Sequence, residues 1–84
     1  MFFKITIKSN LLFSIYPNPN NGIFKLHKDF RYNEIKIYNS YSKEIAFTIS
    51  NANEIDISTQ PAGLYFVKIS DGKKVYVAKV MKEN

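Results

Sequence analysis

Side chains able to perform catalysis or bind a metal are scarce in this chain of 84 residues, which contains one histidine, His27, and no cysteine. The lack of cysteine excludes disulfides, a thiol nucleophile and zinc sites built on thiolates. A serine nucleophile needs an oriented base, and a metal needs several ligands. His27 falls on the outward phase of an alternating segment, and Asp56, between Ile55 and Ile57, points away from the core. We therefore predict no catalytic residue, no metal site and no cofactor, and we do not expect an enzyme.

Lysine dominates the charge of the chain. Twelve Lys and Arg residues against seven Asp and Glu give a net charge of +5. The basic residues are spread out, and their two densest groups lie between Lys25 and Arg31 and between Lys68 and Lys82. Two interpretations stay open. The lysines keep the edges of strands soluble, or they attract anionic partners such as lipopolysaccharide or nucleic acid.

Alternation of apolar and polar residues with a period of two is the strongest structural pattern, and it predicts β-strands. Turn-forming residues separate the runs, and Asp71-Gly72 between two runs predicts a hairpin. A last run begins with Val75 and Val77 and continues to Met81. The residues expected to face the core are Phe24, Leu26, Ile35, Ile37, Ile45, Phe47, Ile49, Ile55, Ile57, Tyr65, Val67 and Ile69.

Strand-and-turn units of roughly ten residues predict an all-β fold, a small antiparallel immunoglobulin-like β-sandwich of about seven strands. We place a boundary near Ser14, so that residues 1–13 form an upstream strand or linker remnant and residues 14–84 form the domain. No apolar run approaches the ~20 residues of a transmembrane span. The N-terminal stretch is basic and interrupted by polar residues, and no small-residue cleavage site follows it, so we do not predict a signal peptide there.

Five ordered pieces of sequence carry a resemblance to a known family. They are Tyr16-Pro17-Asn18-Pro19 followed by Gly22, the strand Ile35–Asn39, the element Ile55–Ser58, the segment Pro61–Ile69 and the lysine-containing run Val75–Asn84. In this order they resemble the type A C-terminal sorting domains of the type IX secretion system, over residues 14–84. One departure is visible, because Ser40–Lys43 stand where the family usually has a turn with glycine.

The resemblance implies a sorting signal that directs a cargo protein across the outer membrane of a Bacteroidetes-type bacterium. It implies a cargo domain on the N-terminal side, recognition by the translocon, and removal of the domain by a sortase-like protease, with lipopolysaccharide as an indirect partner. The expected location is the periplasm in transit, and then the cell surface or the medium. The recognition residues that it implies are Tyr16, Pro17, Asn18, Pro19, Gly22, Gly63, Tyr65, Lys79 and Lys82.

Each of these residues also has a local explanation. The prolines fix φ and lack amide donors, so the segment is either a stiff, exposed feature for a receptor or a stiff start to the first strand. Gly63 supplies a positive φ or a close backbone approach. Tyr65 is expected in the core rather than at a contact. Lys79 and Lys82 are either receptor contacts or solvated lysines at a strand edge.

Two further hypotheses stay open at this point. A carbohydrate-binding or adhesive module would use exposed aromatic residues, here Tyr32, Tyr38, Tyr41 and Tyr76. Nonspecific nucleic-acid binding through the lysines is weaker, and we do not expect nucleic acid as a partner. A sorting domain needs a cargo and a signal peptide, so we expect a truncated or split reading frame, or an excised domain.

Overall fold

The computed structural model describes residues 13–28 and 32–84, and within these ranges it contains eight β-strands and no helix. The predicted upstream segment, residues 1–13, lies outside the described residues except for Phe13, where the first strand begins. The strands are β1 (Phe13–Tyr16), β2 (Ile23–Lys28), β3 (Glu34–Asn39), β4 (Glu44–Ile45), β5 (Thr48–Ile49), β6 (Glu54–Asp56), β7 (Gly63–Ser70) and β8 (Val75–Lys82).

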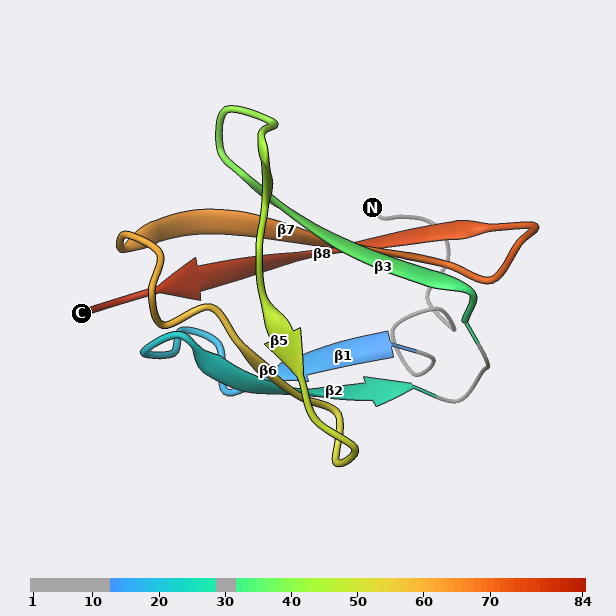
Figure 1. The fold of residues 1–84 in the computed structure, drawn as a ribbon, viewed down its shortest axis with the longest axis horizontal. Helices are drawn as coiled ribbons and strands as arrows, with labels where there is room; N and C mark the ends of the chain where they lie inside the picture. The colour runs from blue at the N-terminus through green and yellow to red at the C-terminus, as the bar shows by residue number, and fades with distance from the viewer. Residues whose placement is uncertain (1–12, 29–31) are drawn as a thin grey trace.

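The strands form two four-stranded sheets, ordered β1-β2-β6-β5 and β4-β3-β7-β8, and all of these pairs are antiparallel. The sheets lie face to face (Figure 1), and buried residues of both sheets form one core. This order corresponds to the two sheets of an immunoglobulin sandwich. The all-β sandwich is therefore confirmed, and the expected seven strands become eight.

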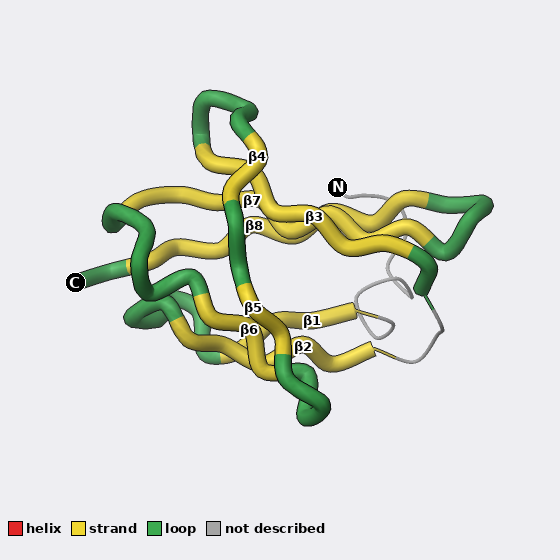
Figure 2. Tube along the Cα trace, in the orientation of Figure 1, coloured by secondary structure: helices red, strands yellow, loops and turns green. Residues whose placement is uncertain are grey.

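The additional strand arises because the alternating run 45–49 divides between the two sheets. Ile45 in β4 pairs with Ile37 of β3, whereas Ile49 in β5 pairs with Ile55 of β6. The chain crosses from one sheet to the other through Ala46 and Phe47 (Figure 2). Both ends of the run face the same core, so their alternation does not reveal the crossing.

The core contains Phe24, Leu26, Ile37, Ile55, Ile57, Tyr65, Val67, Ile69 and Val80. All of these except Val80 were expected there. Of the other expected residues, Ile35, Ile45 and Phe47 are partly buried and pack against this cluster. Ile49 faces the core beside Ile55, as predicted, but it lies on the short edge strand β5, so it remains 37% exposed and is not part of the buried cluster.

In β8 the even-numbered residues face the core, not the set that contains Val75 and Val77, with which the apolar run begins. Val75 and Val77 are 54% and 59% exposed, whereas Val80 is fully buried. The register with β7 explains this difference, because Val80 lies directly opposite the buried Tyr65. Residues that lie opposite each other in a pair of strands share a face of the sheet. Apolar residues occupy both phases of β8, so the pattern alone does not decide which side is buried.

The hairpin between β7 and β8 turns at Asp71-Gly72, as predicted. The Asp71 carboxylate accepts hydrogen bonds from the backbone N–H groups of Lys73 and Lys74, at 2.8 and 2.7 Å. The Asp71 N–H donates to the Lys74 carbonyl oxygen across the turn. The N–H bonds of Lys74 and Lys73 hold the pKa of the Asp71 carboxyl below its ordinary value of 3.8. The ionised carboxylate therefore stabilises the turn.

We expect Val80→Ala to lower the free energy of unfolding by about 1–3 kcal/mol, because it removes buried methyl groups and leaves a cavity. Val77→Ala makes the same chemical change on the exposed phase of β8 and should alter that free energy by less than about 0.5 kcal/mol. Urea unfolding followed by circular dichroism measures both values. Equal losses of unfolding free energy in the two variants would contradict the burial of Val80 and the exposure of Val77.

Acid should weaken the β7–β8 turn. The folded-state pKa of Asp71 is lowered, so its contribution to stability is present above pH 3.8 and is lost as the pH falls through the folded value. We expect the free energy of unfolding to fall less steeply below pH 3.8 in Asp71→Asn than in the parent protein, since asparagine does not titrate. Urea unfolding at several pH values measures the slope, and identical slopes would refute this role of Asp71.

Candidate functional site: the clasp on the last strand

The predicted recognition residues gather around the C-terminal half of β8. On one side, β7 places Gly63 opposite Lys82 and Tyr65 opposite Val80. On the other side lies the connection from β1 to β2, residues 17–22, which we call the clasp. Segments from the beginning, the middle and the end of the domain therefore meet at one strand.

The Asn18 side chain pairs with the edge of β8 as a peptide group would. Its Nδ2 donates to the Lys79 carbonyl oxygen at 2.8 Å, and its Oδ1 accepts from the Met81 N–H at 2.9 Å. A carboxamide offers the same donor and acceptor as a backbone amide. These two bonds flank Val80 and satisfy two backbone groups at the edge of the sheet.

Asn20 repeats this pattern with its own backbone two residues further along. Its N–H donates to the Met81 carbonyl at 2.9 Å, and its carbonyl accepts from the Glu83 N–H at 2.6 Å, which forms a parallel bridge to Lys82. The Asn20 side chain is 7% exposed; it donates to the Pro17 carbonyl and accepts from the Gly22 N–H. A buried amide bonded at both ends holds the clasp in a single shape.

The prolines lie in the connection between β1 and β2, two neighbouring strands of one sheet. The Tyr16–Pro17 and Asn18–Pro19 peptide bonds are both cis. Between β1 and β2 the chain extends to β8 of the opposite sheet, where Asn20 forms a bridge with Lys82. Residues 16–19 remain exposed. The exposure predicted for this segment is therefore observed, and the Asn18 side chain bonds it to β8 at the same time.

Gly22 closes the clasp at a position that admits no side chain. Its φ is +111°, and a Cβ there would lie 2.7 Å from Lys82 Cε and 2.8 Å from Ser58 Cα. Its carbonyl accepts a 2.7 Å hydrogen bond from the Ile57 N–H. A larger residue would strain the backbone and displace the Lys82 side chain.

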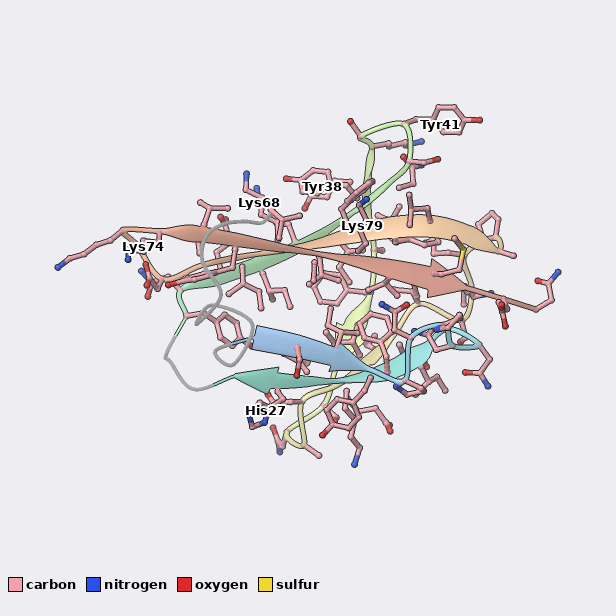
Figure 3. The ribbon with its side chains drawn as sticks, turned by 180° about the vertical axis from the view of Figure 1, so that it is seen from behind. His27, Tyr38, Tyr41, Lys68, Lys74 and Lys79 are labelled. Atoms are coloured by element: carbon pink, nitrogen blue, oxygen red, sulfur yellow. The ribbon has the colours of Figure 1, made fainter. Side chains whose placement is uncertain are left out.

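The two lysines of the motif differ in their surroundings. Lys79 is exposed and lies on the outer face of its sheet, on the same side as Lys68 and Tyr38 (Figure 3). Lys82 is only 6% exposed, because it shares the inward phase of β8 with Val80 and lies against Gly22. The interpretation of Lys82 as a solvated edge lysine is therefore wrong.

Tyr65 supports the same end of the sandwich from β7. It is 3% exposed, as expected for a core residue, and its hydroxyl donates to the Pro61 carbonyl four residues earlier. This geometry is that of the tyrosine corner of immunoglobulin-like folds. Burial raises the pKa of the Tyr65 hydroxyl. Gly63 has a φ of +152°, and a Cβ at this position would have no neighbouring atom within 4 Å, so positive φ rather than close approach explains the glycine.

A family model described as the secretion system C-terminal sorting domain matches residues 14–83. This chain belongs to that family. The match includes the clasp, the tyrosine corner and all of β8. The sorting domain is thus a type IX secretion signal, which implies export to the cell surface or into the medium, and its family is not an enzyme family. A search of the curated proteins found no match.

Among the described residues, no three His, Cys, Asp or Glu side chains come together as a possible metal site. His27 lies in β2 and is exposed on the outer face of the β1-β2-β6-β5 sheet, whereas Lys79 belongs to the other sheet (Figure 3). None of the described residues forms a helix long and apolar enough to cross a membrane.

The four tyrosines considered for carbohydrate binding do not share a surface. Tyr41 is 89% exposed in the β3–β4 turn, and Tyr38 is half-buried on the outer face of β3. Tyr32 and Tyr76 pack against the core instead. The arrangement therefore lacks the flat set of exposed rings on which a sugar would stack.

Asn20 belongs to the site, although it is not among the recognition residues predicted from the sequence. The sequence carries no signal for this role, because Asn20 meets β8 with its backbone, whereas its side chain bonds to Pro17 and Gly22 within the clasp. The pairing depends on the path of β8, which lies about 60 residues later in the chain.

We expect Asn18→Ala to lower the free energy of unfolding by about 1–2 kcal/mol, because it removes two hydrogen bonds to the edge of β8. Asn51→Ala, at an exposed turn between β5 and β6, is the matched control and should change it by less than about 0.5 kcal/mol. Urea unfolding gives both values. Amide hydrogen exchange should quicken at Met81 in Asn18→Ala, and unchanged exchange there would contradict the clasp.

Proposed function

We propose that the type IX translocon recognises the folded domain at the clasped end of β8. One observation supports this above all others: the motif residues, which are scattered from Tyr16 to Lys82 in the sequence, lie around one strand end. Such a site exists only when the sandwich is folded, since its parts come from β1, β7, β8 and the clasp. The translocon would therefore read a shape and not a linear peptide.

The exposed residues at this end provide the contact surface. Tyr16 is 51% exposed and Met81 is 40% exposed, and both prolines and Lys79 are also exposed. The buried members, Gly22, Lys82 and Tyr65, act differently: they hold this surface in place. Aromatic residues and methionine on a rigid support are typical of protein interfaces.

The cargo would precede the domain, and residues 14–84 would form the removable unit. A sortase-like protease would cleave the peptide bond on the N-terminal side of the domain once the cargo has crossed the outer membrane. The acyl group of the cargo would pass either to water or to a nucleophilic group of lipopolysaccharide, and the domain would leave with the new amino terminus. The net charge of +5 favours anionic surroundings such as lipopolysaccharide before this cleavage.

A fusion of residues 14–84 to a periplasm-targeted reporter, in a bacterium with a working type IX system, tests the proposal. We expect the reporter to reach the cell surface or the medium. Tyr16→Ala should lower export at least about fivefold, the effect of losing ~1 kcal/mol of binding. Tyr41→Ala removes an equally large exposed ring from the β3–β4 turn and should leave export unchanged.

Thermal melts of both variants separate recognition from folding. Tyr16 and Tyr41 are exposed, so neither change should lower the melting temperature appreciably. A reporter retained in the periplasm with the unaltered domain would refute the sorting role. Equal export by Tyr16→Ala and the parent would refute recognition at the clasped end.

A further inference from the structure

The edge of β8 is covered by the clasp along only half of its length. The groups that meet the clasp belong to odd-numbered residues: the Lys79 carbonyl, the Met81 N–H and carbonyl, and the Glu83 N–H. Backbone groups on a strand alternate between its two edges, so the N–H and C=O of Val75 and Val77 face the same way. Within the part of the chain that the structure describes, these groups have no hydrogen-bond partner.

This bare stretch differs from the other sheet edges among the described strands. The edge strands β4 and β5 have two residues each and β1 has four, whereas β8 has eight. Proteins commonly protect a long edge with proline, a bulge or an inward-pointing charge. Residues 75–78 have none of these, and the side chains of Val75 and Val77 are more than half exposed.

Positive charge surrounds the bare stretch. Lys73 and Lys74 precede it in the hairpin, Lys79 follows it, and Lys68 lies opposite Val77 on β7. All four side chains are exposed, and among the described residues none of them forms an ion pair. Figure 3 places Lys68 and Lys79 on one face of the sheet and Lys74 at its end.

We infer that the edge at Val75–Lys79 binds an extended, acidic segment of another protein as an additional β-strand. The unpaired N–H and C=O groups supply the main-chain hydrogen bonds of such an addition. Lysines around the stretch select carboxylates by complementary charge. The partner therefore has alternating character, with acidic side chains on the lysine-bearing face and apolar side chains on the face of Tyr76 and Ala78.

A second copy of this chain fits the edge less well. Pairing β8 with β8 would bring two sets of the same four lysines together, and each copy carries a net charge of +5. Like charges placed opposite each other are unfavourable. The inference rests on the backbone groups of Val75 and Val77, which the clasp does not reach, since its first bond on β8 is to the Lys79 carbonyl. Peptide binding at these two residues is therefore tested separately from export through the clasped end.

The probe is a soluble heptapeptide, Glu-Val-Glu-Val-Glu-Val-Glu with blocked ends, titrated into the ¹⁵N-labelled 84-residue protein. We expect the amide signals of Val75, Val77 and Lys79 to shift most, and the same peptide with lysine in place of glutamate to cause no such shift. Absence of shifts with the acidic peptide at millimolar concentration, or equal shifts with the lysine peptide, would overturn the inference.

Val77→Pro tests the edge itself. Its N–H faces away from β7, so proline removes an edge donor without removing a bond of the β7–β8 ladder. We expect at least about tenfold weaker peptide binding in Val77→Pro and parent-like binding in Val77→Thr, which keeps the donor. Unchanged binding in Val77→Pro would overturn the inference.

Two further measurements keep the result decisive. If circular dichroism shows that Val77→Pro is unfolded, the double variant Lys74→Gln and Lys79→Gln replaces it, with the same tenfold loss expected and unchanged binding counting against the inference. Sedimentation of the protein without peptide measures self-association. A dimer that Lys79→Glu strengthens and that excludes the peptide would make a second copy the occupant and overturn the choice of an acidic partner.

Discussion

The backbone edge of the last strand is the constraint on which this small sandwich depends. A strand at the end of a sheet exposes N–H and C=O groups that must bond to something. Here the clasp bonds the edge from Lys79 to Glu83, once through the Asn18 carboxamide and once through the Asn20 backbone. The first and last segments of the domain are thereby joined without a disulfide, which a chain with no cysteine cannot form.

Several side chains take their surroundings from this pairing. Bringing the clasp against β8 leaves no room for a Cβ at Gly22 and covers the Lys82 side chain. On the far side of β8, the Tyr65 corner holds the beginning of β7 through the Pro61 carbonyl. The motif residues of the sorting domain thus build one local structure. The clasp bonds the edge of β8, Gly22 leaves room for the Lys82 side chain, and Tyr65 holds the start of β7. In the proposed function, recognition uses the same residues that hold this end of the fold together.

The two halves of the β8 edge differ in what satisfies them. The C-terminal half is bonded within the chain, whereas Val75 and Val77 are more than half exposed and the backbone groups that they turn away from β7 have no hydrogen-bond partner among the described residues. Lysines at both ends of the bare half make it a poor partner for another copy of itself and a good one for an acidic strand. A single strand can therefore present a closed, shaped end and an open, charged edge to different partners.

Alternation and turn chemistry by themselves determined that the chain is an antiparallel sandwich, that Asp71-Gly72 turns a hairpin, and which apolar residues of β2, β6 and β7 form the core. The ordered motif also determined the family. Only the tertiary structure decided that the run 45–49 divides between two sheets, that β8 buries Val80 and not Val77, and that Lys82 is covered. The reason is that period-two patterns record which residues share a face but not which sheet or which edge they join. Those choices follow from pairings between segments far apart in the sequence, such as Asn18 with Met81 and Tyr65 with Val80.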